Sequence, residues 1–292
     1  MQPIATDNVL INGNRIAHGV YGEGEPVVLV HGTPSASIIW RKIVPALNRA
    51  GYKVHVFDLL GYGESERPWS PQVDTSISGQ VPIVDALFDH WGLRKAHLVA
   101  HDIGGGIAQR FAILHPQRLY SLTMIDVVSF DSYPSKRTLQ QIETGLENMI
   151  RAPADAHREH FCEWLMTASA DPESLEKEAL RMYLDYISGA VGQASLFQHQ
   201  IRHYDPKHTM DIADRLNELG RIPVKLIWGR QDNWQVLDWA FRLRAAIPGS
   251  ELSIVEDAGH FSIEDKPEAV SSLIIGFLEA HTKDEASISS NG

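Results

Sequence analysis

Short apolar runs alternate with stretches of helical length in the first part of the chain. Such continuous apolar runs are typical of strands that are buried on both faces of a sheet. Val27–Val30 is a continuous run of this kind, further strands are predicted at Lys53–Leu59, Ala96–Ala100 and Leu122–Asp126, and the helical stretches between them cover about 38–50, 76–91 and 104–115. Strands that alternate with helices in this way predict an α/β fold with a parallel sheet and helices on both faces.

This alternation stops between Val127 and Leu219, where the pattern is helical and contains no convincing strand. It resumes with two further strands at Val224–Trp228 and Glu251–Val255, and the last helix is expected from Pro267 to about His281. We therefore predict an α/β core formed by residues 1–126 and 220–281 with a helical cap inserted at residues 127–219. Residues 282–292 are polar and are predicted to be a flexible tail.

One turn in the core has a pattern that points to chemistry. The apolar run Leu98–Ala100 ends on His101 and Asp102, and Gly104 to Gly106 then open a helix. This layout is typical of a nucleophile elbow, a sharp strand-to-helix turn whose usual pattern is G-x-S-x-G. Here a carboxylate stands where the serine hydroxyl would be. A free aspartate has a pKa of about 3.9, so Asp102 is expected to be ionised at neutral pH and needs no base to become a nucleophile.

Two further polar residues follow later strands of the predicted sheet. Asp232 comes after the strand that ends at Trp228, and His260 comes after the strand that ends at Val255. In an open parallel sheet, ligands bind at the carboxyl ends of the strands. The order Asp102, Asp232, His260 is the chain order of nucleophile, acid and histidine in the α/β-hydrolase triad. Asp126 ends a strand of its own and is the alternative acid.

Together with His31-Gly32-Thr33-Pro34, these motifs resemble the α/β-hydrolase superfamily over nearly the whole chain. Within it, the sequence is similar to the branch with an aspartate nucleophile, which contains epoxide hydrolases, haloalkane dehalogenases and haloacetate dehalogenases. The resemblance implies that Asp102 attacks a saturated carbon and becomes an ester. His260 would then activate water to hydrolyse this ester, and Asp232 would orient the imidazole. Some relatives of this branch take their acid from the position of Asp126.

The resemblance also implies roles around the elbow. Backbone N–H groups of Thr33 and Ile103 would bind the oxyanion that forms during ester hydrolysis, where one donor is typically worth about 3 kcal/mol. His31 would shape the oxyanion loop, and His101 would support the turn.

The residue after the nucleophile separates the possible reactions. Haloalkane dehalogenases usually have Trp at this position and haloacetate dehalogenases have Arg, whereas this chain has Ile103, which carries no side-chain donor. Only a cap residue such as Trp164 could still bind a halide. We therefore expect epoxide hydrolysis to a diol, with haloalkane dehalogenation as the alternative. Ester or lactone hydrolysis by Asp102 and a non-catalytic binding protein are further alternatives.

An epoxide hydrolase needs an acid that protonates the oxygen of the opening ring. Members of the family commonly use two tyrosines of the cap, and some relatives use a histidine. The candidates in the predicted cap are Tyr183, Tyr186, Tyr204, His157 and His160. Single-sequence helix boundaries do not tell which face of each cap helix looks toward Asp102.

The composition narrows the possible partners. The formal net charge of −11 argues against binding to nucleic acid or to an anionic membrane surface. Only Cys162 is present, so no intrachain disulfide can form, and a reducing compartment is expected. No apolar stretch reaches the length of about 18 residues that a membrane span needs. We expect a cytoplasmic protein, a monomer or homodimer, that acts on a small apolar organic substrate.

No cofactor or metal is expected. From the glycine cluster, the third glycine of a dinucleotide-binding G-x-G-x-x-G pattern would fall on Gln109. His157 and His160 are three residues apart on a predicted helix, but the sequence offers no third metal ligand near them.

Overall fold

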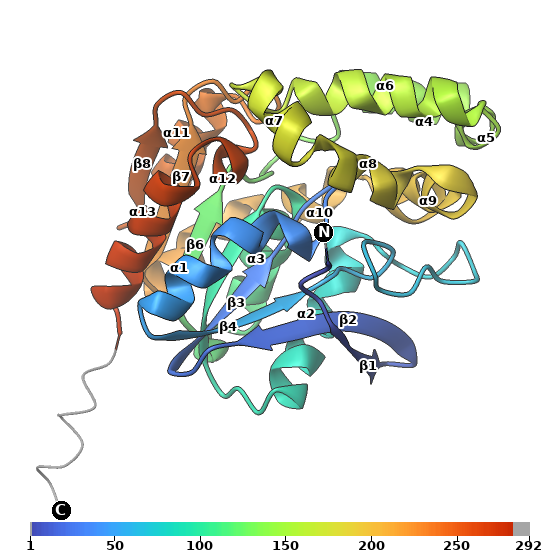
Figure 1. Ribbon diagram of the computed structural model, residues 1–292. Coiled ribbons are helices and arrows are strands. Elements are labelled where there is room, and N and C mark those ends of the chain that lie inside the picture. The colour runs from blue at the N-terminus through green and yellow to red at the C-terminus, as the bar shows by residue number, and fades with distance from the viewer. Residues whose placement is uncertain (1, 283–292) are drawn as a thin grey trace, which may run out of the picture.

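A central sheet of eight strands organises the computed structural model, which describes residues 2–282 (Figure 1). The strand order is β1-β2-β4-β3-β5-β6-β7-β8. The first two pairings, β1 with β2 and β2 with β4, are antiparallel, and all the others are parallel. The strands are β1 Asp7–Ile11, β2 Asn14–Tyr21, β3 Glu25–Val30, β4 Tyr52–Phe57, β5 Ala96–His101, β6 Leu119–Ile125, β7 Val224–Gly229 and β8 Glu251–Val255. The predicted α/β fold with a mostly parallel sheet is confirmed.

Helices cover both faces of this sheet because its central strands are apolar on both sides. All residues of β5 are buried, and so are all residues of β7. The core helices are α1 Val44–Arg49, α2 Ile77–His90, α3 Ile103–Leu114, α10 Lys207–Met210, α11 Leu237–Ala246, α12 Ser262–Asp265 and α13 Pro267–Glu279. Two large apolar clusters result, one on each side, and they contain the fully buried Trp228 and Trp40 respectively.

The helix predicted at about 38–50 is divided into two pieces. A 3-10 segment, η1, covers Ser37–Lys42, and α1 begins at Val44. Pro45 stands at the start of α1 and has no N–H to donate, which is tolerated in the first turn of an α-helix and disfavours a helix that continues through this position. The remaining short segments of the core are η2 Pro116–Arg118 and η5 Ala213–Arg221.

The chain between β6 and β7 contains only helical elements within the residues described. Six helices, α4 to α9, are called the inserted helices below, and Figure 1 shows them as a yellow-green layer over the end of the sheet at which β6 finishes. They are α4 Lys136–Thr144, α5 Leu146–Ile150, α6 Ala154–Met166, α7 Pro172–Glu178, α8 Leu180–Ile187 and α9 Gly189–Ser195, followed by a π-helical turn η3 Leu196–Gln200 and η4 Ile201–His203.

Local signals explain where two of the inserted helices begin. The Asp171 carboxylate accepts a hydrogen bond from the backbone N–H of Ser174 and so caps α7, which begins at Pro172. Gly145 has a positive φ of 95° and separates α4 from α5. In residues 2–282, no helix is long and apolar enough to cross a lipid bilayer. The predicted tail lies outside the described residues from 283 onward.

Candidate active site

The elbow after β5 holds Asp102 in a conformation that few residues adopt. Asp102 has φ 54° and ψ −125°, and α3 begins at the next residue. Non-glycine residues in such regions cost about 1–3 kcal/mol and cluster at functional sites. The surrounding chain is packed too closely for larger residues. A Cβ atom on Gly32 would lie 2.4 Å from the Asp102 side chain, and one on Gly104 would lie 2.4 Å from the His31 carbonyl oxygen.

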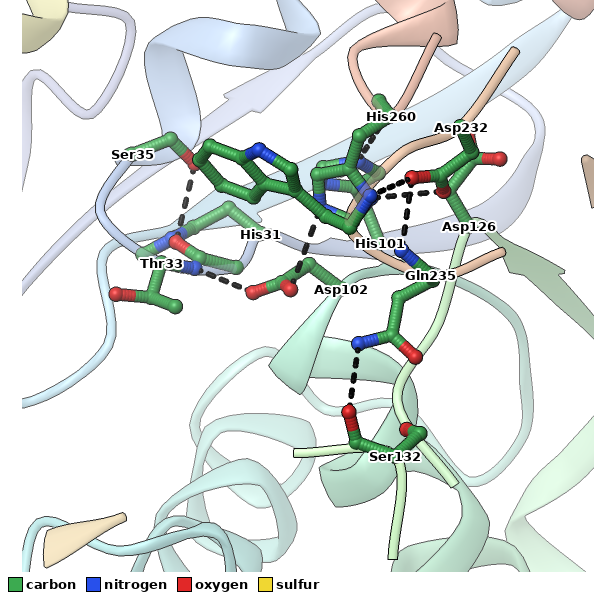
Figure 2. A network of polar contacts seen from close by, with 12 residues as sticks. His31, Thr33, Ser35, His101, Asp102, Asp126, Ser132, Asp232, Gln235 and His260 are labelled. Carbon is green, nitrogen blue, oxygen red and sulfur yellow. Dashed lines mark hydrogen bonds and ion pairs between the residues drawn. The ribbon is translucent and has the colours of Figure 1, made fainter. Parts of the chain in front are cut away.

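Each oxygen of the Asp102 carboxylate has a different neighbour (Figure 2). Oδ1 accepts a hydrogen bond of 2.7 Å from the backbone N–H of Thr33, and Oδ2 lies 3.3 Å from Nε2 of His260. Burial alone would raise the pKa of Asp102, but His260 and the Thr33 N–H outweigh it and hold this pKa below its ordinary value. Asp102 is therefore an ionised carboxylate in a closed site. The N–H of Ile103, the first residue of α3, has no partner within the helix because of its position.

His260 connects Asp102 to Asp232. Its Nδ1 donates a hydrogen bond of 2.9 Å to Oδ2 of Asp232, while Nε2 faces Asp102. The other oxygen of Asp232, Oδ1, accepts bonds of 2.8 Å from the backbone N–H groups of Trp234 and Gln235. Burial disfavours a charged imidazole, but the carboxylates of Asp232 and Asp102 outweigh burial, so the pKa of His260 lies well above its usual value. The three predicted residues thus form one continuous chain of polar contacts.

Asp126 lies near this chain but bonds elsewhere. Its Oδ1 accepts a hydrogen bond of 2.7 Å from the N–H of Gly229, and its Oδ2 accepts one from the hydroxyl of Ser262. Burial and the neighbouring Asp232 raise the pKa of Asp126 well above its ordinary value. Asp126 therefore fixes the ends of β7 and α12 beside the site, and Asp232 is the residue that hydrogen-bonds His260.

His31 and His101 are buried in the scaffold of the site. His31 donates from Nδ1 to the Gly32 carbonyl and accepts the N–H of Leu59 on Nε2, which fixes the loop before Thr33. His101 donates from Nε2 to the carbonyl oxygen of His260 at 2.9 Å. Burial and His260 lower the pKa of His101 to about 3, so it stays neutral beside His260. Both histidines support the loops that present reactive groups.

Asp102 opens into a cavity of about 140 Å³ between the sheet and the inserted helices. Its polar wall includes Ser132, Asn233 and Gln235, and its apolar wall includes Ile103 and Val128. The complete lining is Thr33, Asp102, Ile103, Val128, Ser132, Tyr133, Pro134, Ser135, Thr138, Trp164, Tyr204, Asn233, Trp234 and Gln235. The phenol of Tyr204 is hydrogen-bonded to the hydroxyl of Thr33, so it lies beside the backbone donor that holds Asp102.

Two of the predicted cap residues, Trp164 and Tyr204, line this cavity, whereas His160 lines a second cavity next to it. The other predicted candidates, Tyr183, Tyr186 and His157, are not among the residues that line either cavity. His157 is buried between helices and donates to the carbonyl of Ile187. Tyr186 packs half-buried against the second apolar cluster.

Tyr183 instead anchors the inserted helices to the core. Its hydroxyl donates to the Glu264 carboxylate, which also receives Arg41 and lies 3.5 Å from the ammonium of Lys42. Tyr183 is on α8 and Glu264 is on α12, the helix that follows His260. Both side chains are almost completely buried. This bond therefore links the inserted helices to the segment that carries His260.

Removal of this hydroxyl should destabilise the fold. We expect Tyr183→Phe to lower the free energy of unfolding by about 2 kcal/mol, since the bond it removes is made to a buried charged group. Urea unfolding followed by circular dichroism measures this. Tyr186→Phe is the matched control on the same helix, because the Tyr186 hydroxyl makes no hydrogen bond to any of residues 2–282. Equal losses of unfolding free energy in the two variants would contradict the role of Tyr183 as an anchor.

The sequence did not point to two aromatic residues that line the cavity, Trp234 and Tyr133. Trp234 stacks on the imidazole of His260 at 5.0 Å and on the indole of Trp164 at 4.3 Å, with interplanar angles of 28° and 12°. Its indole N–H donates to the hydroxyl of Thr167. The aromatic stack connects the inserted helix α6 to His260. The closeness of Trp234 to Asp232 in the sequence was the one signal that could have found it.

The parallel sheet, the elbow and the polar chain from Asp102 to Asp232 define a protein class. Residues 25–267 match the family model described as the alpha/beta hydrolase fold. The chain belongs to this family and is an α/β-hydrolase-fold hydrolase.

Two curated relatives and one solved structure are similar over nearly the whole chain. A 2-hydroxy-6-oxononadienedioate/2-hydroxy-6-oxononatrienedioate hydrolase of Paraburkholderia phymatum is 27% identical, with 93% of this chain and 94% of the relative covered. A cis-3-alkyl-4-alkyloxetan-2-one decarboxylase of Shewanella oneidensis is 25% identical, with 91% and 86% covered. An alpha/beta hydrolase fold protein from Burkholderia ambifaria superimposes with a TM-score of 0.83 at 31% identity, with 93% and 97% covered.

Proposed function

We propose that this chain is an aspartate-nucleophile hydrolase that opens epoxides through an ester on Asp102. The proposal rests on the Asp102 carboxylate, whose two oxygens have different partners. Oδ1 is held by the Thr33 N–H at 2.7 Å, and Oδ2 faces the histidine that the second step requires. Such an arrangement prepares one oxygen for attack and keeps the other in a site for negative charge.

The first step is displacement at a saturated carbon. An Asp102 oxygen forms a bond to a carbon of the epoxide, the carbon–oxygen bond of the ring breaks, and its electron pair goes to the ring oxygen. Tyr204 donates its phenolic proton to that oxygen and becomes a phenolate. The raised pKa of Tyr204, caused mainly by burial, keeps the phenol protonated until the ring opens.

The second step is hydrolysis of the ester. His260 takes a proton from water, the resulting hydroxide adds to the Asp102 carbonyl carbon, and the oxyanion is bound by the N–H groups of Thr33 and Ile103. Collapse expels the alkoxide, which takes the proton from His260. The Asp102 acid then ionises and its proton returns to the Tyr204 phenolate. Alkylation of Asp102 also removes one of the two carboxylates that raise the pKa of His260, which favours the neutral base when it is needed.

The cavity favours an epoxide over an alkyl halide. A halide leaves as an anion and needs N–H donors. Ile103 has none in its side chain, and the indole N–H of Trp234 is occupied by Thr167. Trp164 is then the remaining indole of the cavity that could hold a halide. Haloalkane dehalogenation therefore stays the weaker alternative, and Tyr204 beside Thr33 suits an oxygen leaving group.

The relatives suggest a second candidate reaction. Neither curated relative is named as an epoxide hydrolase or a dehalogenase, and one is named for an alkyl-substituted oxetan-2-one, which is a strained cyclic ester. A carboxylate that attacks an acyl carbon gives a reactive anhydride, whereas attack on the saturated ring carbon gives an ordinary ester. Asp102 is thus better suited to attack the saturated carbon of a strained ring than to attack a carbonyl carbon. Opening such a lactone releases a carboxylate and needs no proton from Tyr204.

Substitution of Tyr204 separates these substrates. We expect Tyr204→Phe to slow the alkylation of Asp102 by an epoxide about 100-fold, because general acid catalysis is lost. Alkylation by a β-lactone or an alkyl bromide should change little, since their leaving groups are stable anions. Rapid-quench mass spectrometry of the intact protein measures the alkylation rates. An equal loss with all three substrates would contradict the role of Tyr204 as acid.

A single turnover in heavy-oxygen water tests the proposed function as a whole. With enzyme in excess over an epoxide, the first diol should contain no heavy oxygen, and the peptide that carries Asp102 should gain it. Direct attack of water on the epoxide predicts the opposite labelling and would overturn the proposal. A panel that also contains β-lactones and haloalkanes identifies the ring or leaving group that reacts fastest.

A further inference from the structure

Three aromatic rings form one continuous stack that begins at His260. The indole of Trp234 lies on the imidazole of His260, with ring centroids 5.0 Å apart and an angle of 28° between the planes. The indole of Trp164 stacks on Trp234, with centroids 4.3 Å apart and an angle of 12°. Trp234 follows β7, His260 follows β8, and Trp164 is on α6. The stack therefore joins the inserted helices to the residue that activates water in the proposed reaction.

Hydrogen bonds hold the Trp234 ring in this place. Its indole N–H donates at 2.9 Å to the hydroxyl of Thr167, the residue that follows α6. Its backbone N–H donates at 2.8 Å to Oδ1 of Asp232, which accepts the proton of His260 on its other oxygen. Because the bond to Asp232 comes from the backbone, a substitution of the Trp234 side chain removes the ring and leaves this bond in place.

The ring face matters because His260 has to carry a positive charge while it is completely buried. The π face of an indole has a partial negative charge. It attracts a cation within about 6 Å of the ring centroid, most strongly where solvent is excluded. A protonated imidazole is such a cation, and its distance of 5.0 Å from the Trp234 ring lies within this range.

The carboxylates of Asp102 and Asp232 also face His260, from the ends of β5 and β7, and they raise its pKa well above the usual value. The two other titratable groups beside it are uncharged. His101 on β5 has its pKa lowered to about 3 by burial and by His260, and Asp126 after β6 has its pKa raised by burial and by Asp232. The charge on His260 is therefore balanced by two carboxylates in the resting enzyme and by one of them when Asp102 is an ester.

We propose that Trp234 is a positioning residue for ester hydrolysis, because its ring face stabilises the protonated imidazole of His260. Trp164 and Thr167 hold this ring in place from α6 and its end. The contribution of the ring is greatest after Asp102 has been alkylated, since one carboxylate is then lost. The role in ester hydrolysis rests on the proposed function, whereas the stabilisation of the His260 cation does not.

Titration of His260 by NMR with ¹³C-labelled histidine tests the contact without any substrate. The Asp102→Asn variant imitates the esterified state, since its amide has no charge, and the His260 signal is the one that disappears when His260→Gln is added. In this background we expect Trp234→Leu and Trp234→Met, which have no π face, to lower the pKa of His260 by about half to one pH unit. Trp234→Phe should restore most of the original value, because a phenyl ring presents a π face as well.

Trp239→Leu is the matched control, because Trp239 is the next tryptophan along the chain and stacks on Phe130. It should leave the pKa of His260 unchanged. An unchanged pKa in Trp234→Leu and Trp234→Met would overturn the proposal. An equal decrease in Trp239→Leu, or a decrease in Trp234→Phe as large as in Trp234→Leu, would also overturn it. Thermal unfolding of each variant verifies that the fold is intact.

The pH dependence of ester hydrolysis shows whether the contact serves the reaction. This step needs neutral His260, so its rate rises with pH and reaches a plateau above the pKa of His260. Trp234→Leu should move the rise to lower pH, because a less stable cation loses its proton more easily, and should lower the plateau about three- to tenfold. Alkylation of Asp102 should slow less, since His260 takes no proton in that step. Rapid-quench mass spectrometry of the intact protein measures both rates.

The outcomes separate this proposal from the proposed function. Equal slowing of the two steps in Trp234→Leu, without a shift of the pH profile, would assign Trp234 a purely structural role and overturn the proposal. If no epoxide, lactone or haloalkane alkylates Asp102 while the pKa of His260 still depends on Trp234, the proposed reaction is contradicted and the stabilisation of the His260 cation is supported.

Discussion

His260→Gln is expected to convert the enzyme into one that reacts once and stops. Asp102 needs no base to attack and keeps the Thr33 N–H as a partner, so its alkylation should continue, although more slowly because His260 no longer lowers the pKa of Asp102. Hydrolysis of the ester loses its general base, and steady-state turnover should fall by about 10³ to 10⁴-fold. The intact protein should gain the mass of the substrate in one covalent adduct, and peptide mapping should place the adduct on Asp102. Mass spectrometry after incubation with an epoxide measures both.

Two controls define this experiment. Asp102→Asn in the same His260→Gln background should give no adduct, because an amide oxygen is a poor nucleophile. The labelled peptide in the single variant must contain Asp102 and not another carboxylate. A His260→Gln protein that folds normally and remains unalkylated by epoxides, lactones and haloalkanes would favour a non-catalytic binding protein.

Much of the fold could be predicted because its strands are buried on both faces. Strands such as β5 and β7 are rich in apolar residues and buried along their whole length, as is typical of strands in the interior of a parallel sheet. The polar residues at or just after their carboxyl ends, His101-Asp102 and Asp232, then had to lie at the same edge of the sheet. The division of the helix at about 38–50 was not foreseen, although Pro45 marks the place.

The cap residues could not be predicted because their directions depend on tertiary packing. Tyr183 and Tyr204 both looked like acids in the sequence, but α8 turns Tyr183 toward Glu264 in the core. Tyr204 follows η4 and points to Thr33 instead. A helical period places residues on a face of a helix but does not say what the face meets. The stacking of Trp234 on His260 could not be predicted for the same reason, since it requires the loop after Asp232 to fold back toward His260.

The sequence left two candidates for the acid beside His260, and the structure has a hydrogen bond between His260 and one of them, Asp232. Asp232 accepts the Nδ1 proton of His260 at 2.9 Å, and two backbone N–H groups fix its other oxygen. Asp126 is bonded to Gly229 and Ser262. Because burial and Asp232 raise the pKa of Asp126, we expect a neutral carboxylic acid there at neutral pH. A negative charge on Asp126 would be buried and would be repelled by Asp232, and this is why Asp126 is the acid that is held protonated.

Asparagine substitutions at the two acids should therefore have very different effects. Asp232→Asn presents an amide that cannot hold His260 in the required tautomer or stabilise its cation. We expect turnover to fall by about 10³ to 10⁴-fold, with the Asp102 ester accumulating because the second step is the one affected. Asp126→Asn should change turnover by less than about tenfold, since the amide oxygen can accept from Gly229 and its NH₂ can donate to the Ser262 hydroxyl. Stopped-flow and steady-state kinetics of both variants measure the two steps. Equal losses of turnover would show that the acids act together, and a larger loss in Asp126→Asn would assign the working acid to Asp126.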